Sequence, residues 1–126
     1  MEIVWRSIDA FNRRDLDLAG QDWDGEAVLD WSRSEGVDAG IYRGLQAIRA
    51  FWGAWLEMFD QFDFKPTEFI EGGEHVVIPN LTRLRGRDGV EVEARSVLVA
   101  TVRDCRIVAW RIYQDRAEAL KAVGLI

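Results

Sequence analysis

The sequence predicts an α+β domain in which N-terminal helices pack on the concave face of a strongly curved, mainly antiparallel sheet. Apolar residues recur with helical spacing through much of the first 59 residues. From residue 62 onward they form strand-like runs that end at turn sequences. The last of these runs returns to helical spacing at Asp115. Helices followed by consecutive antiparallel strands are typical of the α+β class.

The first half of the chain supplies three predicted helices and one short strand. Glu2–Arg14 has one apolar face and predicts a helix, and Leu16–Gly20 predicts a short second helix after a break. Ala27–Ser32 alternates and predicts a strand, whereas Arg33–Arg43 contains two glycines and predicts a loop or weak hairpin. The strongest helix spans Leu45–Phe59, and we expect its apolar stripe to be the main helical contribution to the core.

The second half is predicted to form four strands and a closing helix. Gly-Gly, Asp-Gly and Asp-Cys pairs separate the strands, and Asp-Gly suits the positive φ angles of a tight hairpin. The final helix carries its apolar residues with helical spacing after Asp115. At 126 residues, the chain is expected to form one domain, 1–126. The predicted strands are Phe62–Glu71, His75–Arg87, Val90–Arg103 and Arg106–Gln114.

The length of the last hairpin turn predicts which side chains share a face of the sheet. If residues 104–105 form a two-residue turn, Ser96 lies opposite Tyr113 and Leu98 lies opposite Arg111. This face also carries Ala94, and its side chains are small and mixed in polarity. Small side chains on a concave sheet leave volume unfilled. We therefore expect this face to line a central pocket.

Two further expectations depend on the same register. A two-residue turn at residues 88–89 places Arg83 beside Ala94, close to Asp115. The opposite face of the last hairpin is bulky and apolar, so we expect it to form a homodimer interface rather than meet water. That interface is predicted to include Val97, Val99, Trp110 and Ile112.

Composition excludes several classes of partner and site. The net charge of −6 argues against nucleic acid, because binding to its phosphates rests on clustered cations. One cysteine excludes an internal disulfide, and one histidine leaves no zinc-like spacing. No phosphate-binding glycine loop is present, so we expect no metal and no cofactor. Without a signal-like N-terminus or a long apolar run, the expected location is cytoplasmic, with no membrane partner.

Several segments together resemble a known family. The segments are Ala-Phe-Asn-Arg-Arg-Asp-Leu-Asp at 10–17, Gly-Ile-Tyr-Arg-Gly at 40–44 before an aromatic helix, Arg-Asp-Cys-Arg-Ile-Val at 103–108 and Tyr-Gln-Asp-Arg-Ala-Glu-Ala-Leu at 113–120. In this order they are similar to a SnoaL-like protein of the nuclear transport factor 2-like superfamily. The resemblance covers nearly the whole chain.

The resemblance implies a cone-shaped α+β barrel with a deep apolar pocket, usually a homodimer formed through the sheets. It also implies a range of activities, among them polyketide cyclases, ketosteroid isomerases, epoxide hydrolases and members with no known reaction. In the cyclases an aspartate at the end of the last strand is a general acid/base, and Asp115 matches it by position. The cyclases pair that aspartate with a histidine on the preceding strand, where this chain has Leu98 and Val99. A shared fold does not carry a shared reaction.

Asp115 has two interpretations. With Glu118 it forms an Asp-x-x-Glu capping box, in which the aspartate accepts a backbone N–H at the start of the last helix. Alternatively, its carboxylate lies at an apolar pocket mouth and transfers a proton. Tyr113 and Asp30 are the other candidate catalytic residues, and Asp38 is better explained as a turn residue.

Nine further residues are candidates for binding a ligand. Each also has a structural explanation: a helix stripe of aromatic residues packs first in the core, a tyrosine hydroxyl commonly reaches water, and an arginine often pairs or extends to solvent. The candidates are Trp31, Tyr42, Trp52, Trp55, Phe59, Arg83, Ser96, Leu98 and Arg111.

The sequence thus predicts a domain that binds a small hydrophobic molecule, polyketide-, steroid- or terpene-like, in a central pocket. Acid/base isomerase, cyclase or hydrolase activity is one extension of this prediction. The alternative is a non-catalytic ligand-binding or accessory dimer module. The two differ in whether Asp115 faces the pocket beside a second polar partner.

Overall fold

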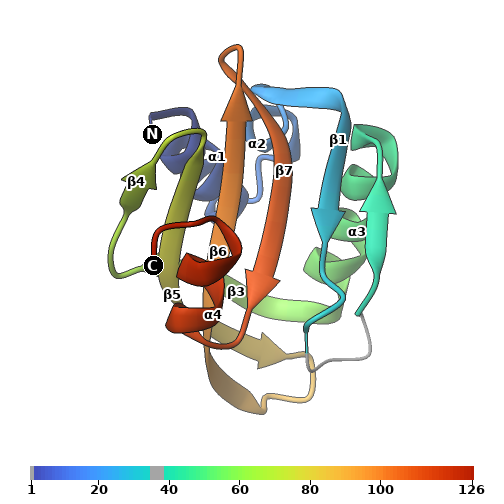
Figure 1. Cartoon of the computed structure of the whole chain (residues 1–126). Helices are drawn as coiled ribbons and strands as arrows, with labels where there is room; N and C mark the ends of the chain where they lie inside the picture. Colours follow the sequence, from blue (N-terminus) through green and yellow to red (C-terminus); the bar gives the residue numbers. More distant parts are fainter. Residues whose placement is uncertain (1, 35–38) are drawn as a thin grey trace.

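One curved, unclosed mixed sheet organises the protein (Figure 1). A computed structural model describes residues 2–34 and 39–126. Asp38 lies outside these described residues. The helices are α1 (Glu2–Asn12), α2 (Leu16–Ala19), α3 (Leu45–Met58) and α4 (Arg116–Ala122). The strands are β1 (Trp23–Asp30), β2 (Ile41–Arg43), β3 (Phe59–Pro66), β4 (Ile70–Gly72), β5 (His75–Gly86), β6 (Glu91–Arg103) and β7 (Arg106–Tyr113). In the sheet they lie in the order β2-β1-β7-β6-β5-β3, and β4 pairs with the start of β5.

Helices cover both faces of the sheet (Figure 1). Helices α1 and α3 pack on the concave face, where buried residues from both helices and the sheet form the larger apolar core. Helix α4 packs on the other face, where Ala119 meets Val77, Val97 and Val99. The predicted α+β architecture, with helices packed on a curved sheet, is confirmed.

The expected strand over residues 62–71 is in fact two strands that pair with different parts of β5. Strand β3 pairs with the second half of β5, as far as Pro66 opposite Asn80, and β4 pairs with the start of β5. Pro79, which has no backbone N–H to donate, lies where β3 gives way to β4, and its carbonyl accepts from the Thr67 N–H at 2.9 Å. The region expected as a loop or weak hairpin contains β2, which pairs antiparallel with β1.

The predicted register of the last hairpin is correct only next to its turn. Arg103 pairs with Arg106 and Val102 with Ile107, but the next pair is Thr101 with Ala109, so Val108 is an extra residue in β7. Such a bulge shifts every later pair by one residue, so the later side chains of the bulged strand point to the opposite face of the sheet. Leu98 is therefore opposite Ile112 rather than Arg111, and Val97 rather than Ser96 is opposite Tyr113.

The register between β5 and β6 also differs by one residue. The connection is a three-residue loop, Arg87 to Gly89, closed by the Gly86 N–H donating to the Val90 carbonyl at 3.0 Å. Gly89 has φ +87°, the left-handed conformation that three-residue hairpin loops require. As a result Arg83 pairs with Glu93, and Thr82 takes the place beside Ala94.

The four residues expected to form a dimer face do not share one face. Trp110 and Ile112 belong to the core under α1 and α3, whereas Val97 and Val99 lie beneath α4. All four are buried within the single chain. The bulge at Val108 explains the error, because it turns the two β7 residues inward. Homodimer formation stays a prediction without a defined surface.

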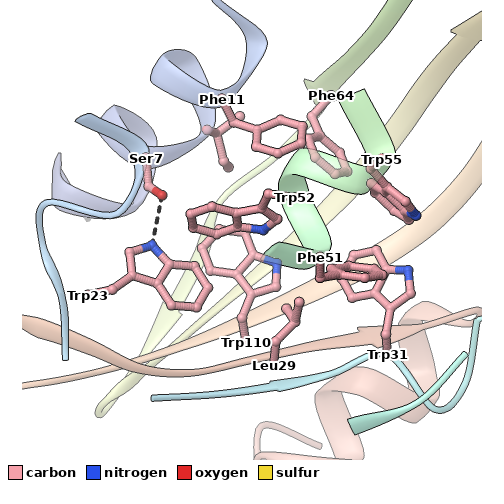
Figure 2. A pocket seen from close by; sticks show the side chains of 11 residues that line it. Ser7, Phe11, Trp23, Leu29, Trp31, Phe51, Trp52, Trp55, Phe64 and Trp110 are labelled. Carbon is pink, nitrogen blue, oxygen red and sulfur yellow. Dashed lines mark hydrogen bonds between the residues drawn. The ribbon is translucent and has the colours of Figure 1, made fainter. Parts of the chain in front are cut away.

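One buried polar contact fixes the position of a core tryptophan. The Ser7 hydroxyl of α1 donates to the Ala19 carbonyl at 2.7 Å. It also accepts from Trp23 Nε1 at 2.9 Å, as Figure 2 shows. Ser7 is 5% exposed and Trp23 is 3% exposed. The Trp23 ring then stacks on Trp110 and meets Trp52 edge-on, with centroids 5.5 and 5.1 Å away. This contact links α1, β1, β7 and α3.

We expect Ser7→Ala to lower the free energy of unfolding by about 1–3 kcal/mol, because it leaves the buried Trp23 N–H and Ala19 carbonyl without a partner. Urea unfolding of the purified protein measures the change. In a Trp23→Phe background, which keeps an aromatic ring but no N–H, the same substitution should cost less. An equal cost in both backgrounds would contradict the role of this hydrogen bond.

Candidate functional site: two cavities on the concave face

Two cavities lie between the concave face of the sheet and the helices that cover it. The inner cavity has a volume of about 30 Å³, room for a water-sized molecule only. Aromatic side chains from α1, α3 and the sheet converge on it from opposite sides (Figure 2). Its lining consists of Ser7, Ile8, Phe11, Trp23, Leu29, Trp31, Phe51, Trp52, Trp55, Phe64 and Trp110. The Ser7 hydroxyl is already bonded on both sides, and the other lining residues are aromatic or aliphatic.

The outer cavity has a volume of about 550 Å³, within the range of small-molecule sites in proteins. The end of α3, strand β3 and the concave faces of β5 and β6 form its walls. Apolar side chains dominate. Most of the polar ones come from β5 and β6, and Ser34 and Gln114 follow β1 and β7. Its lining consists of Trp31, Ser34, Trp55, Met58, Phe59, Phe62, Phe64, Thr82, Leu84, Val92, Glu93, Ala94, Arg95, Ser96, Ile112 and Gln114.

Three aromatic residues line both cavities and separate them. They are Trp31, Trp55 and Phe64. The Trp31 and Trp55 rings meet edge-on with centroids 5.3 Å apart. Because the inner cavity is too small for an organic molecule, a ligand that leaves these rings in place occupies the outer cavity and contacts the side of the rings that faces it.

The buried polar groups of the outer cavity are neutral and lie on the sheet. Thr82 and Ser96 are both buried on the concave face. Gln114, which follows β7, is exposed, and its Nε2 donates to the Arg33 carbonyl at 2.9 Å. The cavity therefore favours an uncharged ligand that can accept or donate a few hydrogen bonds.

The charged residues of the described lining, Glu93 and Arg95, are exposed. They alternate along β6 with Ala94 and Ser96, so their side chains extend from the other face of the strand. Glu93 accepts a hydrogen bond from Arg83 Nε at 2.8 Å. Both charges thus lie at the rim of the cavity rather than in its interior.

The residues that end and follow α1 hold the cavity wall in place. Asn12 makes two hydrogen bonds of 2.8 Å with the backbone of Phe64, donating to its carbonyl and accepting from its N–H. Arg14 donates to the carbonyls of Leu56 at the end of α3 and of Phe59 and Asp60 at the start of β3. The family-like segment 10–17 thus fixes Phe64 and the end of α3 against α1.

Four of the predicted ligand-binding aromatic residues line a cavity. Trp31 and Trp55 line both, Trp52 lines the inner one and Phe59 the outer one. Tyr42 instead stacks on Phe51, with centroids 4.2 Å apart, at the edge of the core. Contact between these rings and a ligand stays a prediction.

The remaining predicted ligand-binding residues separate into two groups. Ser96 lines the outer cavity. Leu98, the next residue of β6 on the same face, is buried in the core. Arg83 is exposed and ion-paired with Glu93 on the other face of the sheet. Arg111 also lies on that face, where its Nη1 donates to the Tyr113 hydroxyl at 3.1 Å. The expected approach of Arg83 to Asp115 over a small residue is therefore not formed.

The three predicted catalytic residues do not meet at either cavity in the described structure. Asp115 is exposed and caps α4, accepting from the Ala117 N–H at 3.4 Å. Its capping-box partner Glu118 forms an ion pair with Arg33 instead. Tyr113 is buried on the face covered by α4. Asp30 accepts hydrogen bonds from the Ser32 backbone and hydroxyl, which closes a local turn after β1.

Sequence reasoning missed Thr82, Leu84, Ile112 and Gln114, which line the outer cavity. All four follow from the two register shifts, which turn even-numbered residues of β5 and β7 toward the concave face. The sequence signal for the bulge in β7 is the spacing of Ile107 and Trp110. Two bulky apolar residues three positions apart within a strand both become buried when a bulge lies between them.

Shifted pKa values occur away from the two cavities. The pKa of Glu74 is lowered because Arg103 donates hydrogen bonds to its carboxylate, and the same contact raises the pKa of Arg103. Glu74 precedes β5 and Arg103 ends β6, so this pair lies outside the cavity lining. Within the described residues, no group of three or more His, Cys, Asp or Glu side chains is arranged to hold a metal ion. None of the helices there is long and apolar enough to cross a membrane.

Comparisons with known proteins agree with the fold. Residues 4–110 match the model of the SnoaL-like domain. Similar solved structures include an NTF2-like protein of unknown function from Burkholderia pseudomallei, with 25% identity and a TM-score of 0.81, covering 96% of this chain and 94% of that chain. Curated proteins give no match.

Two further solved structures share the fold at lower identity and contain ligands. TerC, co-crystallised with polyporic acid, is 18% identical with a TM-score of 0.80, covering 98% of this chain and 96% of that chain. A protein with a ketosteroid isomerase-like fold from Catenulispora acidiphila, in complex with trimethylamine, is 15% identical with a TM-score of 0.79, covering 99% of this chain and 94% of that chain.

The α+β architecture, with helices on a curved sheet, is what these structures share with this chain. The family model spans residues 4–110, which is most of the chain. The protein therefore belongs to the SnoaL-like domain family, with the nuclear transport factor 2-like fold.

Proposed function

We propose that the protein binds a small, predominantly apolar and uncharged molecule in the outer cavity. The observation that carries this proposal is a space of about 550 Å³ with aromatic residues at its inner end and hydroxyl groups on its sheet wall. Burial of apolar ligand surface against Trp31, Trp55 and Phe59 provides the affinity. Hydrogen bonds from the sheet orient the ligand.

The placement of the charged residues supports binding rather than acid/base turnover. A general acid or base must lie within hydrogen-bond reach of the proton that it transfers. Asp115 caps α4, Asp30 closes a turn, and neither belongs to the described lining of a cavity. Glu93 does line the outer cavity, but its carboxylate is ion-paired with Arg83. We therefore favour the non-catalytic ligand-binding module among the functions that the sequence left open.

The class of ligand follows from the lining. Planar aromatic or alicyclic molecules, including polyketide-, steroid- and terpene-like ones, present flat apolar surfaces to Trp31 and Trp55. The net charge of −6 disfavours strongly acidic ligands. The TerC structure, which shares the fold, contains polyporic acid. That neighbour supports a small organic molecule as the kind of ligand to test.

A ligand in the outer cavity should stabilise the folded protein. At a free concentration of about 100 times the dissociation constant, the gain is about 2.7 kcal/mol and the melting temperature rises. Differential scanning fluorimetry against a panel of neutral aromatic and alicyclic alcohols, ketones and epoxides measures this rise. No stabilisation by any member of the panel would contradict the proposal.

A larger side chain in the outer cavity should weaken ligand binding. Ala94→Phe places a ring among the lining residues, and we expect it to weaken binding of the best panel compound by more than about tenfold, because the space for the ligand is lost. Leu81→Phe is the matched control, since Leu81 is half-buried on the opposite side of β5. Isothermal titration calorimetry measures both. Equal weakening by the two variants would place the ligand elsewhere.

Substitutions of Asp115 separate its two roles. Asp115→Asn should leave both stability and ligand affinity unchanged, because asparagine caps a helix as well as aspartate does. Asp115→Ala should lower the free energy of unfolding by about 1 kcal/mol and still leave the affinity unchanged. Thermal unfolding and calorimetry measure the two quantities. Conversion of a bound compound by the wild type that is lost in the asparagine variant would instead support an acid/base role.

A further inference from the structure

We propose that Asn80, together with Thr82 and Ser96, forms a hydrogen-bonding site that selects ligands carrying a hydroxyl group. This inference rests on the proposed function and specifies the chemistry of its ligand. The three residues are neighbours on the concave face: Asn80 and Thr82 are two positions apart on β5, and Ser96 is directly opposite Asn80 on β6. Of the three, the sequence singled out only Ser96, as a lining residue.

These residues mark the boundary between the solid core and the outer cavity. Going along the concave face from the core, the pair Ile78 and Leu98 is fully buried and apolar. The next pair is Asn80 and Ser96, which are 4% and 8% exposed. Thr82 follows and, like Ser96, lines the outer cavity. Asn80 thus lies between the apolar core and two cavity-lining hydroxyl groups.

The hydrogen bonds of Asn80 are incomplete. Its Nδ2 donates to Thr82 Oγ1 at 2.8 Å, but Oδ1 is buried without a partner in the described structure. A buried amide oxygen without a donor is unfavourable, because it has lost its bonds to water. Leucine or valine would fill such a core position at lower cost. The asparagine is explained if a ligand supplies the missing donor.

The unused hydrogen-bonding capacity of the three residues defines the complementary group. Asn80 Oδ1 accepts a hydrogen bond. The Thr82 hydroxyl, which already accepts from Asn80, retains its own proton for donation, and the Ser96 hydroxyl can do either. A group that both donates and accepts fits this set, and an alcohol, phenol or enol hydroxyl is the simplest. A ketone or ether offers an acceptor only and leaves Asn80 Oδ1 without a partner.

The test compares two probes, one with a phenolic proton and one with a methyl group in its place. We expect 2-naphthol to bind the wild-type protein about tenfold more tightly than 2-methoxynaphthalene, because only the phenol supplies a donor. In the double variant Asn80→Leu/Thr82→Val, which removes both partners of the internal hydrogen bond, the two probes should bind within about twofold of each other. Isothermal titration calorimetry gives both dissociation constants.

Two measurements distinguish ligand selection from a structural role. Thr101→Val removes another buried hydroxyl of β6, one that contacts His75 rather than the cavity, and should keep the preference for the phenol. The double variant should have a melting temperature at or above that of the wild type without ligand, since the unpartnered oxygen is gone. A fall in melting temperature together with an unchanged preference would overturn the inference.

The outcomes also separate this inference from the proposed function. Equal binding of both probes by the wild type would reject selection by Asn80 while leaving ligand binding in the outer cavity intact. Binding of neither probe would count against both proposals. A preference for the phenol that survives in the double variant would assign the selection to another part of the cavity and overturn the role of Asn80.

Discussion

One extra residue in β7, Val108, determines which side chains face the interior of this protein. The bulge lets Ile107 and Trp110, three positions apart, both enter the core on the concave face. Trp110 then stacks on Trp23, which is held by the Ser7 hydroxyl of α1. Without the extra residue, alternation would send Trp110 to the face that α4 covers. The packing of helices against the sheet therefore depends on this local irregularity.

The two cavities follow from how unevenly the concave face is filled. At one end, rings from α1, α3 and the sheet leave a space of only about 30 Å³. At the other end, Ala94 and Ser96 are too small to reach the end of α3, and the outer cavity of about 550 Å³ remains. Asn12 and Arg14 fix the opposite wall through backbone hydrogen bonds. A rigid wall and short side chains facing it produce a preformed site, which lowers the cost of ordering on binding. Asn80, Thr82 and Ser96 lie where the apolar core ends. Strands β5 and β6 therefore supply both core side chains and hydrogen-bonding groups.

Much of the fold could be predicted from the sequence, whereas the candidate site could be predicted only in part. Helical spacing identified Trp52 and Trp55 as inward-facing, because helix periodicity survives small errors in the ends of a helix. Strand faces have no such tolerance, since a shift of one residue exchanges them completely. The bulge at Val108 and the three-residue loop before Val90 each caused such a shift. The sequence left Asp115 with two roles, a helix cap and a proton-transfer group. In the structure it caps α4, and Glu118 pairs with Arg33 rather than completing the capping box.

The central proposal is that the outer cavity on the concave face holds a small hydroxylated apolar molecule. Crystals soaked with 6-bromo-2-naphthol test it most directly, because anomalous scattering from the bromine locates the bound molecule wherever it lies. We expect a bromine peak among the lining residues near Trp31 and Trp55, with the hydroxyl oxygen within hydrogen-bond distance of Asn80 Oδ1. A well-occupied peak on the α4 face of the sheet, with the outer cavity holding only solvent, would contradict it.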